Sequence, residues 1–184
     1  MLTLNISPFP ELQTERLILR AVKQTDVHEV FTLRSDKETM RYIAKPLMKT
    51  LSDAEAHIKI IEEGIKKKEH INWAITLKGE DKLIGILGFY RMALEHHRSE
   101  VGYMLLKQYH RKGIMNEALN AVIDYGFNKI KFHQIEAIID NNNAASEGIL
   151  IKNKFVKEAH FKENYLFGGK YLDSVHYTIL AKNR

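Results

Sequence analysis

Residues 108–118 read Gln-Tyr-His-Arg-Lys-Gly-Ile-Met-Asn-Glu-Ala, and the structure expected for the rest of the chain follows from them. The preceding residues 100–106 are apolar and β-prone, which favours a strand. In and after the quoted stretch, Met115, Leu119 and Val122 recur at helical spacing. The sequence therefore predicts a strand, a basic turn that contains a glycine, and the N-terminus of a helix, in that order.

This turn has the properties of an anion-binding site. The first backbone amides of a helix have no partner inside the helix, and the helix dipole adds partial positive charge at the same end. Gly113 lets the backbone approach a ligand closely, while Arg111 and Lys112 supply mobile positive charge. One glycine is a weak motif, so a basic turn whose amides meet only water stays an alternative.

Two common phosphate-binding loops are excluded by the same residues. No second glycine and no Gly-Lys-Ser/Thr follow Gly113, which excludes a Walker loop. The dinucleotide pattern Gly-x-Gly-x-x-Gly is also absent. What remains is a cradle for a pyrophosphate group that is built around a single glycine.

Composition limits the classes to which the protein can belong. With 184 residues, 45% hydrophobic and 28% charged, the chain is expected to form one domain that spans residues 1–184. It has no cysteine, so a disulfide framework, a thiol nucleophile and a thiolate metal site are excluded. The N-terminus lacks a basic stretch followed by a long apolar run, and we expect a soluble cytoplasmic protein without a membrane partner.

The net charge of +5 suits either a nucleic-acid binder or an enzyme that binds phosphate. The lysines are dispersed, and the one run of three, residues 66–68, fits a solvated helix face. No RNA-binding or zinc-finger pattern supports nucleic-acid recognition, so we expect no direct nucleic-acid partner.

The remaining chain alternates between strand-like and helix-like segments. Apolar β-prone stretches predict strands at residues 16–20, 72–77, 82–94, 98–107, 134–140, 154–160 and 171–180. Apolar residues at helical spacing, with capping residues before them, predict helices that begin after Thr25 or Asp26, at residues 36–42, at the capping-box pattern of residues 52–55, at the glycine turn and at residue 144.

Five short motifs in this order resemble the GNAT acetyltransferases and, among them, the RimJ/RimL type. They stand at Thr14–Arg20, Ile84–Gly88, Glu100–Tyr103, Gly113–Ala118 and Asn143–Ser146, so the resemblance covers nearly the whole chain. Three positions depart from the family pattern: His110 stands where the acetyl-CoA motif has Gln or Arg, Met115 where it has Gly or Ala, and Lys154 where a glycine is usual.

The resemblance implies a fold and a reaction. The fold would be α/β with a mixed α+β sheet, that of the GNAT acyl-CoA N-acyltransferases, in which helices flank a mostly antiparallel sheet that splays at the cofactor strand. The reaction would be transfer of the acetyl group of acetyl-CoA to a primary amine by direct attack in a ternary complex, without a metal. The acceptor would be a protein or peptide N-terminus, such as that of a ribosomal protein. The alternatives are a polyamine or aminoglycoside and a non-catalytic acyl-CoA sensor, and we expect a monomer or homodimer.

By the same resemblance, acetyl-CoA lies along the predicted strand, the glycine turn and the helix that follows the asparagines. The pyrophosphate is expected on the amides of residues 112–116, and Asn143 either contacts the pantetheine arm or caps its helix. The residues expected to contact the cofactor are Met104, Leu105, Leu106, His110, Arg111, Lys112, Gly113, Ile114, Met115, Asn116, Asn143 and Ser146.

Acetyl transfer requires a base for the acceptor amine and a proton donor for the departing thiolate. Glu100 is the candidate base or part of a water-bridged relay, although it could instead be a surface carboxylate paired with Arg98 or a lysine. By family analogy Ser146 is the candidate thiolate donor, with Tyr165 as the alternative. A backbone amide near residues 104–106 would bind the oxyanion.

The resemblance places the acceptor cleft between about residues 31–45, 94–98 and 162–170. Three acidic residues in or near these segments, Glu38, Glu95 and Glu163, could attract a cationic amine. The histidines at positions 96, 97 and 110 lack the spacing of a metal site, and we expect no metal. Glu117 at the helix start is expected to orient the glycine turn rather than to react.

Overall fold

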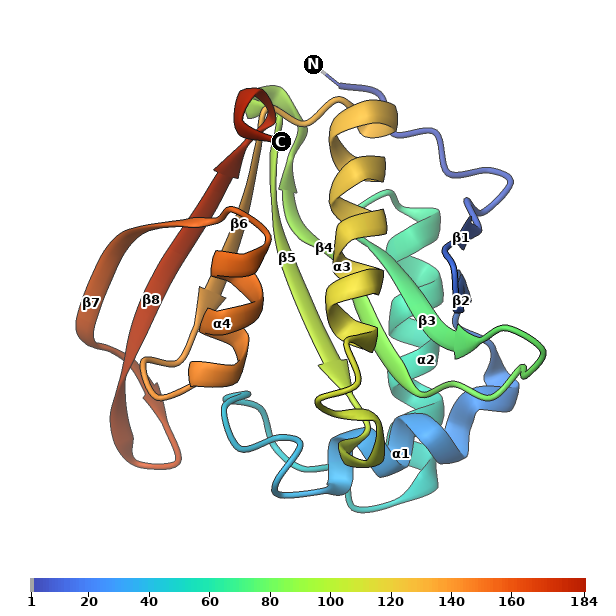
Figure 1. Ribbon diagram of the computed structural model, residues 1–184. Helices are drawn as coiled ribbons and strands as arrows, with labels where there is room; N and C mark the ends of the chain where they lie inside the picture. Colours follow the sequence, from blue (N-terminus) through green and yellow to red (C-terminus); the bar gives the residue numbers. More distant parts are fainter. Residues whose placement is uncertain (1) are drawn as a thin grey trace.

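One eight-stranded sheet organises the protein, with its strands in the order β1-β2-β3-β4-β5-β6-β8-β7 (Figure 1). The computed structural model describes residues 2–184. Neighbouring strands run antiparallel except β5 and β6, which are parallel. The strands are β1 (Leu12–Gln13), β2 (Leu17–Ala21), β3 (Ile71–Leu77), β4 (Gly85–Ala93), β5 (Arg98–Leu105), β6 (Gln134–Ile139), β7 (Val156–Phe167) and β8 (Lys170–Leu180). This confirms the predicted mixed, mostly antiparallel sheet.

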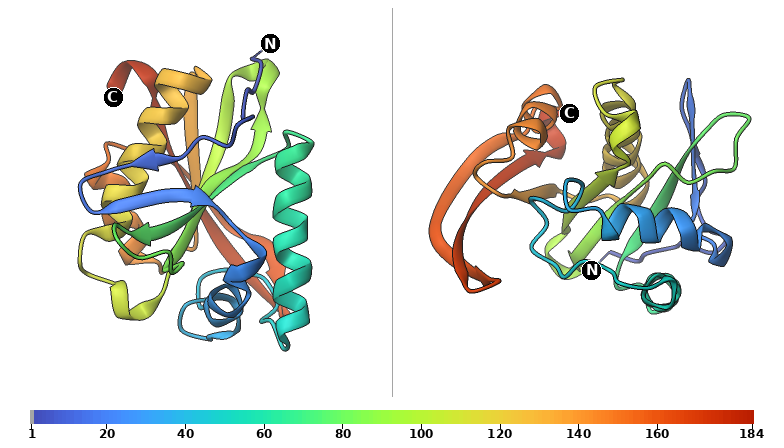
Figure 2. Two further views of the ribbon diagram at one scale, coloured as in Figure 1. Left: turned by 90° about the vertical axis from the view of Figure 1, so that its right-hand side faces the viewer. Right: turned by 90° about the horizontal axis from the view of Figure 1, so that it is seen from below.

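Four α-helices cover the two faces of the sheet. They are α1 (Val27–Ser35), α2 (Leu51–Lys66), α3 (Ile114–Tyr125) and α4 (Ala144–Lys152), and a π-helical turn, Gly126–Ile130, continues α3. Figure 2 shows α3 and α4 on one face and α1 and α2 on the other. The sheet therefore separates α3 and α4 from α1 and α2.

Alternation along β5 divides its side chains between two hydrophobic cores. Val101 and Leu105 pack with the buried residues of α3, such as Leu119, on one face. Met104 packs with residues of α1 and α2, such as Ile58, on the other face. Because Glu100 and Met104 are an even number of residues apart, Glu100 belongs to the α1 and α2 face.

The sheet splays at β5 and β6. Their parallel pairing joins only Arg98–Glu100 to Gln134–Glu136, whereas β6 stays paired with β8 as far as Ile139. Figure 1 shows the two strands diverging beyond this short ladder. The edge of β5 that faces β6 is therefore unpaired beyond Glu100, which confirms the splay predicted at the cofactor strand.

The start of α2 differs from the sequence prediction. The predicted capping box at residues 52–55 is wrong, because the cap is Thr50, whose side chain accepts a hydrogen bond from the Asp53 amide. The Asp53 side chain accepts in turn from the amides of Lys49 and Thr50. The same type of capping box therefore operates two residues earlier.

The helix predicted at residues 36–42 is also wrong, because this segment forms successive turns. The carboxylate of Asp36 accepts hydrogen bonds from both the amide and the hydroxyl of Thr39. This is the bonding pattern of a helix N-cap, and the Met40 amide also donates to the Asp36 carbonyl, so a single helical turn forms but does not continue.

Lys154, which stands where the family has a glycine, keeps the turn that a glycine would make. Its φ of 65° lies in the left-handed region. The amide of Lys154 donates to the Ile151 carbonyl and its ammonium group donates to the Arg184 carbonyl. The backbone therefore keeps this turn although a lysine stands where the family has a glycine.

Candidate functional site

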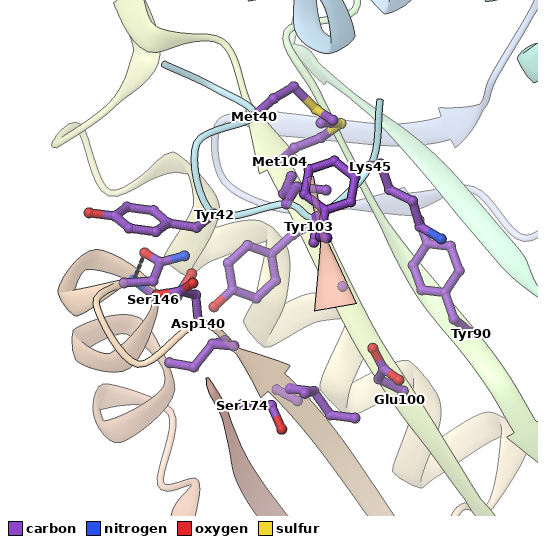
Figure 3. Close-up of a pocket in the computed structure, with 18 of the residues that line it drawn as sticks. Met40, Tyr42, Lys45, Tyr90, Glu100, Tyr103, Met104, Asp140, Ser146 and Ser174 are labelled. Atoms are coloured by element: carbon purple, nitrogen blue, oxygen red, sulfur yellow. Dashed lines mark hydrogen bonds between the residues drawn. The ribbon is translucent and has the colours of Figure 1, made fainter. Parts of the chain in front are cut away.

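A cleft of about 1010 Å³ opens where β5 and β6 separate (Figure 3). Its walls come from the segment between α1 and α2, from α2, from β5, from the end of β6 and from the β7–β8 hairpin. Two of the three segments predicted for the acceptor cleft, about residues 31–45 and 162–170, contribute lining residues. The third, residues 94–98, contributes no lining residue among those the structure describes, and its place is taken by α2 and the end of β6.

Glu100 lies in this cleft, on the face of the sheet that carries α1 and α2. Its side chain is mostly buried, with 17% of its surface exposed, and accepts a hydrogen bond from Arg91. Burial raises the pKa of Glu100 above its ordinary value, and this effect together with that of Glu136 outweighs the opposing charge of Arg91. A partly desolvated carboxylate with a raised pKa is suited to accept a proton near neutral pH.

The backbone of β5 supplies hydrogen-bond donors to the gap. The Leu106 amide donates to the Ile84 carbonyl beside β4. Because successive residues of a strand direct their amides to opposite sides, the Met104 amide also points toward β4, whereas those of Tyr103 and Leu105 point toward the gap. Of the predicted residues 104–106, only Leu105 can therefore offer its amide there.

The glycine turn and the start of α3 have the predicted shape. Gly113 has a φ of 75° and occupies the N-cap position, where it carries no side chain that could cap the helix. The amides of Ile114, Met115 and Asn116 are therefore left for water or a ligand. The side chains of Ile114 and Met115 are buried in the core, so a large residue at position 115 does not obstruct the turn.

Other residues of the predicted cofactor set shape the turn. His110 approaches the Leu105 carbonyl through its Nε2 atom, 2.9 Å away, and so holds the turn against the end of β5. Arg111 and Lys112 are exposed. The side-chain oxygen of Asn116 accepts from Asn153, so this side chain contacts the end of α4 rather than the turn.

Hydrogen bonds of Glu117 connect the first turn of α3 to the residues just before β2. One of its oxygens accepts from the Thr14 hydroxyl at 2.5 Å and from the Arg16 amide at 2.8 Å, and the other accepts from Arg16 Nε at 2.7 Å. Arg16 also donates to the Lys112 carbonyl. Glu117 thus orients the turn, as its position at the helix start indicated.

Replacing Glu117 with glutamine is expected to lower the free energy of unfolding by about 1 to 2 kcal/mol at pH 7, because charged hydrogen bonds are lost at a partly exposed site. Burial acts to raise the pKa of Glu117, but the hydrogen bonds from Thr14 and Arg16 outweigh it and hold the pKa below its ordinary value. The stabilisation is therefore present above the unfolded pKa of about 4.5 and is lost as the pH falls through the folded value.

Urea unfolding of the wild type and Glu117→Gln between pH 3 and pH 7 checks this expectation. The difference in stability should shrink as the pH falls. Glu15→Gln removes the same charge from an exposed neighbour of Arg16 and serves as the control. An equal loss of stability in both variants would mean that the change in net charge explains the effect, rather than the loss of the hydrogen bonds that Glu117 accepts from Thr14 and Arg16.

The start of α4 faces the other side of the cleft. Asn143 caps this helix, since its side-chain oxygen accepts from the Ser146 amide at 3.1 Å. Asn143 and Ser146 both line the cleft. Figure 3 places Ser146 beside Tyr103 and on the opposite side of β5 from Tyr90 and Glu100.

Tyr103 is a candidate that sequence reasoning missed. Its hydroxyl is buried, lines the cleft and has no hydrogen-bond partner with normal geometry among residues 2–184. Burial raises the pKa of Tyr103 to about 12, with a smaller opposing effect from Ser146, so the hydroxyl keeps its proton at neutral pH. The signal in the sequence was strand alternation, which places Tyr103 on the face opposite Glu100. The helix predicted to begin at residue 144 carries Ser146, and the structure brings the two hydroxyl-bearing residues together on that face.

The Tyr165 hydroxyl, the alternative candidate for the thiolate donor, is already engaged in a hydrogen bond. Its hydroxyl donates to the Ala44 carbonyl at 3.1 Å. The side chain thus joins the β7–β8 hairpin to the segment between α1 and α2 across the cleft. The structure favours Tyr165 as a bridge between two walls.

Within residues 2–184, no group of three histidine or acidic side chains is arranged to hold a metal ion. No helix in this part of the chain has the length and apolar character needed to cross a membrane.

Comparison with known proteins agrees with this geometry. Residues 16–156 match the model of the acetyltransferase (GNAT) domain. The uncharacterized N-acetyltransferase YoaA of Bacillus subtilis is 31% identical over 172 residues, which cover 94% of this chain and 97% of YoaA. The [ribosomal protein uS5]-alanine N-acetyltransferase of Escherichia coli is 26% identical over 176 residues, which cover 91% of this chain and 89% of that protein.

A solved structure gives the same result for the fold. The GNAT-family acetyltransferase of Bacillus anthracis superposes with a TM-score of 0.85 at 27% identity, covering 94% of this chain and 99% of the other. The matched family model spans β5, the glycine turn and the start of α4. The chain therefore belongs to the GNAT acetyltransferase family.

Proposed function

We propose that this acetyltransferase moves the acetyl group of acetyl-CoA to the N-terminal amine of a protein or peptide, as enzymes of the RimJ/RimL type do. The observation that carries the proposal is the meeting of two sites at the unpaired edge of β5. A candidate anion site stands at the start of α3, and the cleft opens through the gap, with Glu100 on the α1 and α2 face and Ser146 on the α4 side. The similarity to the uS5-alanine acetyltransferase supports a protein N-terminus as the acceptor class.

In this proposal, the donor binds on the α3 side. The pyrophosphate of acetyl-CoA accepts hydrogen bonds from the amides of residues 112–116, and the positive end of the α3 dipole favours its charge. The pantetheine arm follows the unpaired edge of β5, where the Tyr103 and Leu105 amides point into the gap. These amides can also bind the thioester oxygen as it becomes an oxyanion.

The acceptor enters from the α1 and α2 side. Its ammonium group loses a proton to Glu100, directly or through water, and the neutral amine attacks the thioester carbon. The tetrahedral intermediate then collapses with cleavage of the carbon–sulfur bond. The thiolate takes a proton from the hydroxyl of Tyr103 or Ser146 and leaves as a thiol. That hydroxyl regains a proton from the attacking nitrogen, and the product is a neutral N-acetyl amide.

The cleft has the extent that a peptide requires. It has a volume of about 1010 Å³ and extends from the α1–α2 connection to the β7–β8 hairpin. The three acidic residues expected to attract a cationic amine, Glu38, Glu95 and Glu163, do not line it, so that prediction is wrong. A closed acidic pocket, which a polyamine would favour, is not what the described residues form.

Thiol release from acetyl-CoA tests the proposal with three acceptor classes: peptides with free N-termini, polyamines and aminoglycosides. We expect turnover with free peptides and none with the same peptides after N-acetylation. Turnover with polyamines or aminoglycosides alone would assign the enzyme to small amines. Tight acetyl-CoA binding without turnover on any class would instead support an acyl-CoA sensor.

Replacing Tyr103 with phenylalanine is expected to reduce kcat by about 10-fold, since one proton donor for the thiolate is lost. The melting temperature should stay the same or rise, because the deleted hydroxyl is buried and without a partner. Steady-state kinetics and thermal unfolding of the same sample check both expectations. Ser146→Ala and the double variant show whether the two hydroxyls share the role: a kcat unchanged in the double variant would contradict a role for either.

A further inference from the structure

Arg34, near the end of α1, places a guanidinium group in the cleft without an anionic partner. Its side chain is partly buried and lines the cleft. The Nε atom is buried and has no hydrogen-bond partner in the described chain, and the Nη1 atom has only the sulfur of Met104, at 4.0 Å. None of the ion pairs formed within residues 2–184 includes Arg34.

The groups packed around Arg34 do not neutralise its charge. His57 lines the same part of the cleft, and burial, with the charge of Arg34 and a smaller effect of His70, lowers the pKa of His57 to about 4. Burial raises the pKa of Tyr90 to about 12, so Tyr90 carries no negative charge at neutral pH. The carboxylate of Glu69 lines the cleft but is exposed and forms no ion pair with Arg34 among the described residues.

The same wall of the cleft carries further positive charge. Three more basic side chains from the segment after α1 line the cleft, and none forms an ion pair within residues 2–184: Lys37, Arg41 and Lys45. Elsewhere in the cleft, Glu100 is paired with Arg91, Asp173 is hydrogen-bonded to His160, and Asp140 accepts hydrogen bonds from Asn142. A partly desolvated cation without a counter-ion is costly, and a bound anion would remove that cost.

The phosphates of acetyl-CoA do not supply this anion. Arg34 contacts Met104, whose side chain belongs to the core on the α1 and α2 face. The helix α3, whose first amides form the proposed pyrophosphate site, packs on the opposite face (Figure 2). The unpaired charge therefore belongs to the side from which the acceptor enters.

Tyr90 links this charge to the reacting amine. It lies directly opposite Glu100 in the β4–β5 ladder, where facing α-carbons are about 5 Å apart. Arg34 contacts Met104, and Glu100 lies four residues earlier on the same face of β5, roughly 13 Å along the strand. Arg34, Tyr90 and Glu100 all line the same cleft. An anion on Arg34 would thus lie within a few extended residues of an amine on Glu100.

We propose that Arg34 binds the carboxylate of an aspartate or glutamate at the second or third position of the acceptor peptide. The inference rests on the proposed function and specifies its substrate class. A peptide rises about 3.3 Å per extended residue, so a side chain one or two residues after the amine spans the region around Tyr90. Lys37, Arg41 and Lys45 extend the positive wall for further acidic residues and repel polyamines.

Matched peptides that differ only by Asp or Asn at position 2 or 3 test the inference through kcat/KM for acetylation. We expect the wild type to prefer the acidic peptide by about 10- to 100-fold, as a charged hydrogen bond would give. Arg34→Met should bring the ratio close to one, Arg34→Lys should keep part of it, and Arg34→Glu should favour a peptide with Lys at that position. Lys59→Met, on the exposed face of α2 outside the cleft, is the matched control and should keep the wild-type ratio.

Equal kcat/KM for the acidic and amide peptides in the wild type would overturn the inference, and so would an unchanged preference in Arg34→Met. The wild-type comparison and Arg34→Lys answer the question even if the other Arg34 variants do not fold. A lack of turnover on every peptide would contradict the proposed function itself, and the inference with it. Turnover on peptides without a charge preference would overturn only the inference.

Discussion

Glu100→Gln is expected to reduce kcat for acetyl transfer by about 100- to 1000-fold, the contribution typical of a well-placed general base. The glutamine keeps the shape of the side chain but cannot accept the proton of the acceptor ammonium. Acetyl-CoA affinity, measured by calorimetry, should stay the same, because Glu100 lies on the face opposite the proposed pyrophosphate site. Thiol release at saturating acetyl-CoA gives kcat.

The pH profile separates a base from a structural carboxylate. Glu100 acts only when ionised, so activity should fall as the pH drops through its pKa, which burial holds above the ordinary value. Arg91 favours the ionised form. Arg91→Gln should therefore move the acidic limb of the profile to higher pH. Near wild-type activity of Glu100→Gln, or a limb that Arg91→Gln leaves in place, would contradict the role of Glu100.

Gly113→Glu is expected to weaken acetyl-CoA binding by at least about 100-fold. The φ of 75° is strained for any residue with a side chain, and a Cβ would lie 3.4 Å from a guanidinium nitrogen of Arg16. The added carboxylate would also stand where the proposed site holds the pyrophosphate, and like charges repel. Calorimetric titration with acetyl-CoA measures the loss.

Gly79→Glu provides the control for backbone strain. Gly79 has a φ of 85° in the turn between β3 and β4, and a Cβ there meets no atom within 4 Å. The variant should show a similar loss of stability while it keeps wild-type affinity for acetyl-CoA. If Gly113→Glu also kept that affinity, the pyrophosphate would bind somewhere other than the amides of residues 112–116.

Local patterns were sufficient to predict most of the elements that build the site. Apolar alternation located β5, and the glycine followed by helical spacing located the start of α3, because both signals arise from neighbouring residues. The errors in the fold also have local causes. At the start of α2, Thr50 with Asp53 and Ser52 with Glu55 are two overlapping capping patterns, and the sequence does not rank them.

The site was less predictable because its parts are distant in sequence. Glu100 and Gly113 could be predicted from the strand and the turn that carry them. The approach of Arg34 to Met104, by contrast, depends on how α1 packs against the sheet. The same applies to the pairing of Tyr165 with Ala44, which the folded hairpin brings together. The positive charge of the cleft wall that carries Arg34 could therefore be recognised only in the structure.

Mass spectrometry of a peptide acetylated with isotope-labelled acetyl-CoA tests the proposed function most directly. The peptide carries a free N-terminal amine, an acidic residue at position 2 and one internal lysine, so that two amines compete. The proposed function predicts a single labelled acetyl group on the N-terminal amine in the wild type and almost none with Glu100→Gln. Label on the lysine alone, or no label on the peptide while a polyamine in the same mixture is acetylated, would contradict it.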